Sequence, residues 1–128
     1  MWCRVLVMKI ISLNVRGLGG FEKRREVSQL VREKKPFIVC IPETKLTVFD
    51  EVTCKSLWGD ANVGFSFQPS VGAAGGLLTL WDYTKVEVWS SLSFEHVLVI
   101  TGRFLQSEEH FVLFNVYAPS DVNRQQAL

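Results

Sequence analysis

The sequence lacks three features that would assign a protein to a class at once: a disulfide framework, a membrane-spanning run and a strong net charge. Its three cysteines are an odd number with no close pair and no metal-type spacing, so a reducing compartment fits best. The apolar segment at residues 1–13 contains Arg4 and Lys9. It is too short to span a bilayer and has no signal-peptide cleavage site. We therefore expect an intracellular protein, nuclear or cytoplasmic, that does not bind a membrane.

The weak net charge removes the simplest argument for nucleic-acid binding. Lys and Arg number 14 against 13 Asp and Glu, which leaves a net charge of +1 and no basic field around the whole chain. The positive side chains are nevertheless uneven, because many of them crowd into one early stretch: Arg16, Lys23, Arg24, Arg25, Arg32, Lys34 and Lys35. Two interpretations stay open, a solvated helix face and a surface that faces phosphates.

The chain is long enough and apolar enough for one domain with a core. It has 128 residues, 48% of them hydrophobic, and we find no repeat, low-complexity tract or linker. Residues 8–14 and 37–41 read as buried strands, and residues 22–34 between them read as a helix with one apolar face. This order predicts a strand–helix–strand unit whose two strands pair in parallel.

The remainder of the chain changes from helix to closely spaced strands. Thr47, with Asp50 three residues later, could cap a short helix that runs to about Leu57 and ends at Gly59. Five further strands are then expected, separated by turn residues, at 63–67, 77–81, 86–91, 97–104 and 111–117. These elements predict an α/β protein.

Three short segments, each placed where a predicted strand passes into a loop, carry the functional information. They are Leu13-Asn14-Val15-Arg16-Gly17, Ile41-Pro42-Glu43-Thr44-Lys45 and Asn115-Val116-Tyr117-Ala118-Pro119. Strand ends hold reactive groups well because the sheet sets their position and the loop exposes them. Parallel strands that end at Asn14 and Glu43 would bring both side chains to one edge of the sheet, close enough to share an ion.

Each of these residues also has an ordinary structural interpretation. Asn14 alone is typical of a turn former, Glu43 of a solvated loop carboxylate, and Tyr117 of an amphipathic strand end.

Taken together and in order, the segments resemble the first half of the endonuclease/exonuclease/phosphatase family, the deoxyribonuclease-like group. Within it they are most similar to the endonuclease domain of plant-type non-LTR (LINE-like) retrotransposons. The resemblance also includes Gly75-Gly76-Leu77-Leu78-Thr79-Leu80-Trp81 and begins at Met8. It implies the N-terminal half of a four-layer α/β/β/α sandwich, with one mixed sheet and flanking helices. Residues 1–128 would then be a truncated domain, with residues 1–7 as an extension.

The resemblance also implies roles for individual residues. Glu43 would be a ligand of Mg²⁺ (or Mn²⁺), and Asn14 would lie beside that ion without adding negative charge. Tyr117 would place its hydroxyl on the scissile phosphate. Arg16 and Lys45 would hold neighbouring phosphates of the DNA partner.

The sequence also departs from the family pattern. Leu13 stands where the family has Trp, and Pro42 stands where it has Gln and could give Glu43 a different direction. No Gly-Asp-Phe-Asn motif or terminal Asp-His pair follows, and His96 and His110 read as structural residues.

We therefore expect a fragment of a Mg²⁺-dependent DNA endonuclease that is inactive or weakly active by itself. The alternatives are a non-catalytic nucleic-acid or protein interaction module and a decayed retroelement remnant. The last predicted strand carries mostly apolar residues on both of its faces. We therefore also expect an uncovered sheet face that promotes self-association or binds a partner.

Overall fold

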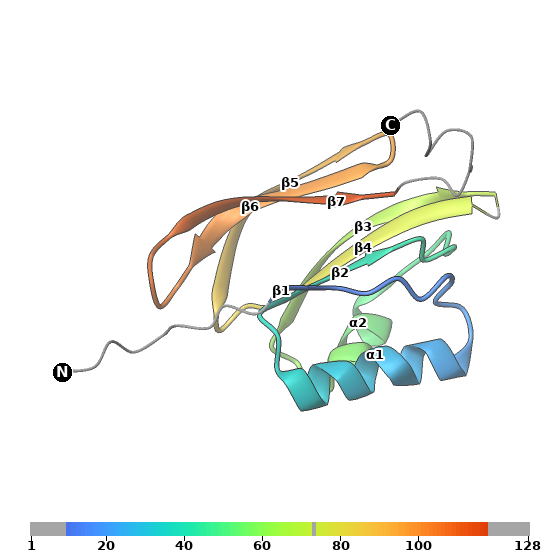
Figure 1. The fold of residues 1–128 in the computed structure, drawn as a ribbon, viewed down its shortest axis with the longest axis horizontal. Helices are drawn as coiled ribbons and strands as arrows, with labels where there is room; N and C mark the ends of the chain where they lie inside the picture. The colour runs from blue at the N-terminus through green and yellow to red at the C-terminus, as the bar shows by residue number, and fades with distance from the viewer. Residues whose placement is uncertain (1–9, 73, 118–128) are drawn as a thin grey trace.

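The computed structural model describes residues 10–72 and 74–117 as an α/β fold of two helices and two sheets (Figure 1). The predicted extension at residues 1–7 and the Ala118-Pro119 end of the last motif lie outside the described residues. The elements, in chain order, are β1 (Ile10–Ser12), α1 (Phe21–Lys34), β2 (Ile38–Pro42), α2 (Glu51–Trp58), β3 (Val63–Val71), β4 (Ala74–Asp82), β5 (Val86–Phe94), β6 (Val97–Phe104) and β7 (His110–Val116).

The first sheet has the strand order β1-β2-β4-β3 and carries both helices on one face (Figure 1). β1 and β2 are parallel, with Ile11 opposite Val39, which confirms the predicted strand–helix–strand unit. α1 buries Val27 and Val31 against this sheet, and α2 adds Leu57 and Trp58 to the same core. The helical layer therefore covers one face of the sheet and leaves the other face to the rest of the chain.

The second sheet, β5-β6-β7, is antiparallel and packs on that other face. The α/β class is confirmed, and the first sheet is the predicted mixed sheet, with β1 and β2 parallel and β4 antiparallel to its neighbours. The strands from Val86 onward form a second sheet instead of extending the first. Alternation along a strand shows that it has an inner face but does not show which strand it pairs with. Ile38 and Cys40 of the first sheet pack with Val86 and Phe104 in the core between the sheets.

Polar side chains also join the two sheets. The buried Asn115 amide on β7 donates to the Leu78 carbonyl at 3.0 Å and to Thr79 Oγ1 at 3.1 Å, both on β4. The hydroxyls of Ser66 and Ser91 form a second link between the sheets. These bonds hold the end of β7, and with it Tyr117, over the first sheet.

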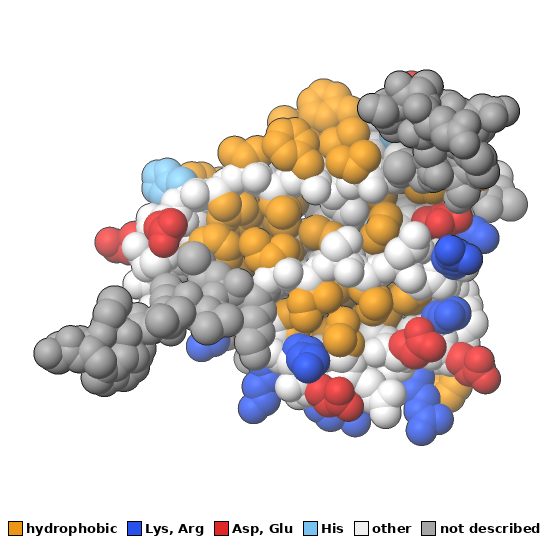
Figure 2. All heavy atoms as spheres, viewed as in Figure 1, with side chains coloured by type: hydrophobic (Ala, Val, Ile, Leu, Met, Phe, Trp, Pro, Cys, Tyr) orange, Lys and Arg blue, Asp and Glu red, His pale blue; other side chains and the backbone are white. Residues whose placement is uncertain are grey.

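The outward side of the second sheet is strongly apolar, as the alternation in its last strand predicted. We call the following exposed side chains of β5 and β7 the outer face: Trp89, Leu92, Phe94, Val112, Phe114 and Val116. Each is at least 50% exposed, and Figure 2 shows apolar side chains gathered along the upper rim of the molecule. The uncovered surface therefore belongs to the second sheet, because the first sheet is covered on both faces.

One helix boundary differs from its prediction. α2 is capped by Asp50, whose Oδ1 accepts from the Thr53 N–H at 2.8 Å, and the predicted cap at Thr47 is wrong. Asp50 satisfies a free N–H of the first turn, and hydrogen bonds with the side chain and then the backbone N–H of Thr53 lower the pKa of its carboxyl. Gly59 ends the helix in the left-handed conformation, as predicted. Within the described part of the chain, no helix is long and apolar enough to cross a membrane.

The link through Asn115 gives a stability prediction. Asn115→Ala leaves the buried Leu78 carbonyl without its side-chain donor, so we expect the free energy of unfolding to fall by about 1–3 kcal/mol in urea denaturation. Val116→Thr, one residue on and half exposed, keeps a β-branched side chain and should change that free energy by less than about 0.5 kcal/mol. Equal effects of the two substitutions would mean that Asn115 does not tie the sheets together.

Candidate functional site

The loops that follow β1 and β2 lie at the same edge of the first sheet. Parallel pairing brings the carboxyl ends of the two strands together, and backbone bonds then join the loops. Gly17 N–H donates to the Glu43 carbonyl at 2.9 Å, and Leu18 N–H donates to the Thr44 carbonyl at 2.8 Å. The structure thus brings the Asn14 and Glu43 segments together at one edge, as the sequence predicted.

Thr44 is the centre of this edge and was assigned no role from the sequence. It is fully buried, and its N–H donates to the Gly76 carbonyl at 3.0 Å, while Lys45 N–H donates to the Gly75 carbonyl at 2.8 Å. Its hydroxyl accepts from Leu46 N–H at 3.2 Å. Through these bonds the segment after β2 is held between the loop after β1 and the start of β4.

Gly75 and Gly76 permit this close approach. Their φ angles are +81° and +87°, and a Cβ on Gly76 would overlap Thr44 Oγ1 and lie 3.3 Å from Lys45 N. A side chain at Gly76 is therefore excluded by both backbone conformation and space. Two consecutive glycines at the start of a predicted strand were the available signal for such an approach.

Asn14 and Arg16 form an exposed turn at the edge. Asn14 Oδ1 accepts from Arg16 N–H at 3.0 Å, and Arg16 has φ +53°. The turn interpretation of Asn14 is thus confirmed, and the turn carries the Arg16 guanidinium into solvent beside the sheet edge. Of the early basic cluster, Arg16 alone lies in this loop; the remaining members lie on α1 or, for Lys35, directly after it.

Glu43 and Lys45 lie on either side of Thr44 and approach each other. Both have positive φ angles, and Lys45 Nζ lies 3.9 Å from Glu43 Oε1. The Glu43 side chain is 17% exposed and the Lys45 side chain 42%. The carboxylate is therefore partly shielded, and the ammonium group stays accessible to an anion from solution.

Tyr117 reaches the same edge from the second sheet. Its N–H donates to the His96 carbonyl at 2.9 Å, and its ring lies 5.5 Å from the His96 ring. A Cβ on Gly75 would be 3.7 Å from the Tyr117 ring. The Tyr117 ring therefore lies over the open side of Gly75, whose carbonyl accepts from Lys45 N–H.

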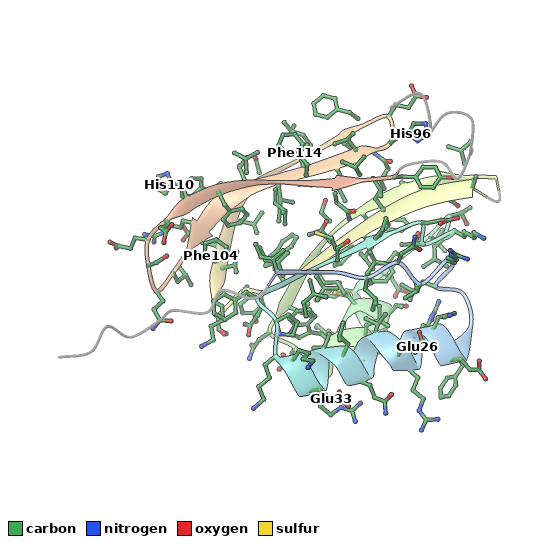
Figure 3. All side chains as sticks on the ribbon, in the orientation of Figure 1. Glu26, Glu33, His96, Phe104, His110 and Phe114 are labelled. Atoms are coloured by element: carbon green, nitrogen blue, oxygen red, sulfur yellow. The ribbon has the colours of Figure 1, made fainter. Side chains whose placement is uncertain are left out.

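The two histidines have different surroundings. His96 lies in the turn between β5 and β6 beside Tyr117, whereas His110 packs edge-on against Trp89 with 4.7 Å between ring centroids. Figure 3 places them at opposite ends of the second sheet. Sequence reasoning gave both a structural role and did not associate His96 with the site, because the turn is 21 residues from Tyr117 in sequence.

The oxygen donors at the edge are consistent with a weak Mg²⁺ site. Glu43 supplies one carboxylate and Asn14 one amide oxygen, and no group of three or more His, Cys, Asp or Glu gathers among residues 10–72 and 74–117. Mg²⁺ is often held by one or two carboxylates, with water and substrate phosphate as the other ligands. Glu43 and Asn14 are therefore the residues that would hold such an ion.

The described cysteines take no part in this chemistry. Cys40 and Cys54 are free and buried, and burial raises the pKa of each thiol to about 11. A thiol in that state is a poor nucleophile and a poor metal ligand at neutral pH.

Solved structures with the same arrangement of elements include two AP endonucleases and TDP2. The AP endonuclease LMAP from Leishmania major matches 93% of this chain and 43% of its own length, with TM-score 0.67 and 22% identity. An AP endonuclease from Archaeoglobus fulgidus matches 88% of this chain and 42% of its own, with TM-score 0.63 and 18% identity. TDP2 from D. rerio, complexed with a single-strand DNA product, matches 94% of this chain and 52% of its own length, with TM-score 0.58 and 14% identity.

These similarities establish the fold, which is that of the N-terminal part of the AP endonuclease structures. No protein-family model matches the chain. The chain spans about half the length of the structures that it matches.

The close approach of Gly76 to Thr44 gives a second stability prediction. We expect Gly76→Ala to lower the free energy of unfolding in urea by more than Gly59→Ala, whose cost should be about 1–2 kcal/mol. Gly59 has a similar φ of +94° but open space around its Cβ position, so it isolates the cost of backbone conformation. If the two variants lose the same stability, overlap with Thr44 is not what requires glycine at position 76.

Proposed function

We propose that residues 1–128 are the N-terminal half of a metal-dependent phosphodiesterase domain that acts on DNA, and that this chain alone binds DNA but cleaves it weakly or not at all. One observation carries the proposal. The four segments that resemble the nuclease family are far apart in sequence, yet hydrogen bonds join three of them at one edge, and Tyr117 of the fourth lines the same hollow as Gly75.

The accessible cations at this edge suit DNA phosphates. Arg16 lies in an exposed turn, and Lys45 has a side chain that is 42% exposed. Arg16 would hold a phosphate through its planar fork of donors, and Lys45 would hold a neighbouring phosphate as a point charge. The Tyr117 hydroxyl would then donate to the phosphate that lies between them and the metal ligands.

Glu43 and Asn14 would hold Mg²⁺ or Mn²⁺ beside that phosphate. When bound, the ion supplies charge that polarises a phosphoryl oxygen and stabilises the leaving group. The weak activity that we propose follows from the donor set. One carboxylate and one amide hold Mg²⁺ poorly, and the Lys45 ammonium group 3.9 Å from Glu43 competes for the same carboxylate.

A retroelement origin is the more specific part of this proposal. It is supported by Arg16, at a position where apurinic endonucleases carry an acid, and by the Gly75–Trp81 stretch of the sequence. An intracellular location, nuclear or cytoplasmic, is also proposed, because an odd number of cysteines with no close pair suits a reducing compartment. A decayed remnant without its own role and a non-catalytic interaction module are the alternatives that the experiments below distinguish.

DNA binding at the sheet edge should depend on Arg16 and Lys45. We expect the affinity for duplex DNA to fall steeply with salt, and Arg16→Ala or Lys45→Ala to weaken binding and reduce the log–log salt slope by about 1 each. Fluorescence anisotropy across a salt series measures both quantities. Lys55→Ala is the matched control, because Lys55 pairs with Glu51 on α2, away from the edge.

An affinity that does not change with salt would contradict phosphate binding. If a combined Arg24→Ala, Arg25→Ala and Arg32→Ala variant loses affinity while Arg16→Ala and Lys45→Ala do not, the phosphate-binding surface is the exposed face of α1.

The same protein should nick supercoiled plasmid weakly or not at all in Mg²⁺, and EDTA should make little difference. Glu43→Gln, which keeps the size of the side chain but removes its charge, is the control for any residual nicking. Efficient nicking that needs both Mg²⁺ and Glu43 would overturn the proposed inactivity and show that half of the fold forms a competent site.

We also propose that the outer face is covered in the functional protein, by self-association or by a polypeptide partner. Its six large apolar side chains form one exposed surface of the kind that marks an interaction site. We expect light scattering of the purified chain to show a mass that rises with concentration, and Leu92→Ser with Phe114→Ser to reduce that rise. A monodisperse monomer at high concentration would contradict this proposal.

A further inference from the structure

A hollow of about 360 Å³ lies beside Tyr117, next to the sheet edge described above. Gly75 and Gly76 line one part of it, and His96 and Tyr117 line another. The same Gly75 and Tyr117 belong to the edge that carries Lys45. The hollow is therefore continuous with the place where we propose that DNA phosphates bind.

His96 occupies an unusual backbone position at the rim of this hollow. Phe94 pairs with Val97, so Glu95 and His96 form a two-residue turn, and His96 has φ +62°. Positive φ at this turn position favours glycine or asparagine, since most other side chains are strained there. Histidine is one of the residue types that tolerate this conformation, and the turn brings its ring to the rim of the hollow.

The ring of His96 is placed against Tyr117 and remains accessible. The two ring centroids are 5.5 Å apart at an interplanar angle of 55°, and the His96 side chain is 47% exposed. The Phe94 backbone carbonyl also lies at this hollow and accepts from Gln68 Nε2. A site with aromatic faces and a glycine backbone suits a flat ring.

The charge around the hollow argues against a phosphate in it. Glu95 is one of the residues around the hollow, and its carboxylate lies 3.5 Å from His96 Nε2, so an anion that approached the histidine would meet a negative group. A nucleobase has no such charge and stacks on aromatic side chains whatever its identity.

We propose that this hollow is a nucleobase subsite, in which the base of the nucleotide next to the bound phosphate stacks on His96 and Tyr117. The proposal rests on the proposed function, because the phosphate bound near Lys45 brings the base to the hollow. Its ligand is one unpaired base of a DNA strand.

Two oligonucleotides separate the contribution of the bases from that of the phosphates. The probes are a short oligothymidylate and an oligomer of the same length in which every nucleotide is abasic. We expect the wild-type chain to prefer the oligothymidylate by about tenfold in fluorescence anisotropy, the ratio that corresponds to roughly 1.4 kcal/mol of stacking. His96→Gly and Tyr117→Leu should remove most of this preference, and Tyr117→Phe, which keeps the ring, should retain it.

His96→Gly is also a sharp control for folding, because glycine prefers the backbone conformation that His96 adopts. Its melting temperature should be no lower than that of the wild-type chain. His96→Asn, which tolerates the same conformation without an aromatic ring, should lose the preference as well. If either variant folds and keeps the preference for bases, the subsite does not exist.

Histidine ring signals in NMR report the site directly. The chain has two histidines, and titration with thymidine 5′-monophosphate should move the His96 signals upfield and leave those of His110 unchanged. Unmoved His96 signals with equal affinity for both oligomers would overturn the subsite. The proposed function would survive that result if Lys45→Ala still weakened binding, and both proposals would fail if neither oligomer bound.

Discussion

The backbone of Thr44 joins the loop after β1 to the start of β4 at the candidate site. Its carbonyl accepts from the loop after β1, and its N–H donates to the start of β4. Because the residue is fully buried, these bonds are shielded from competition by water, and losing either one would leave a buried polar group unpaired. Glu43 and Lys45, the two charged residues of the segment, are positioned by this one residue between them.

The scaffold of the edge is thus made by main-chain groups, and the functional side chains are left comparatively free. Asn14 closes its own turn, and the Glu43–Lys45 pair is long at 3.9 Å. Such a pair contributes little to stability at a partly exposed site. The Lys45 ammonium group can therefore leave Glu43 to bind a phosphate, and the Glu43 carboxylate can bind a metal ion, without disturbing the backbone that carries them.

The second sheet has two consequences for function. Its inner face, through Asn115, sets the height of β7 above the first sheet and so delivers Tyr117 to the edge. Its outer face leaves six large apolar side chains in solvent. The structures that share this fold are about twice as long, and an apolar face of this kind is where we expect further polypeptide to pack. The second sheet thus contributes Tyr117 to the candidate site at one end and carries the proposed association surface on its outer face.

The sequence by itself determined the local features whose causes are local. The alternation and helical spacing of apolar residues predicted the elements, the order of strand, helix and strand predicted the parallel pair, and the strand ends predicted that the loops after β1 and β2 would lie at one edge. The tertiary structure alone decided what depends on pairing between distant segments. It divided the strands between two sheets, made Thr44 and Gly76 the centre of the edge, and placed His96 beside Tyr117. A sequence pattern records which face of a strand is apolar, but hydrogen bonds and side-chain contacts between segments far apart in the chain determine what that face meets.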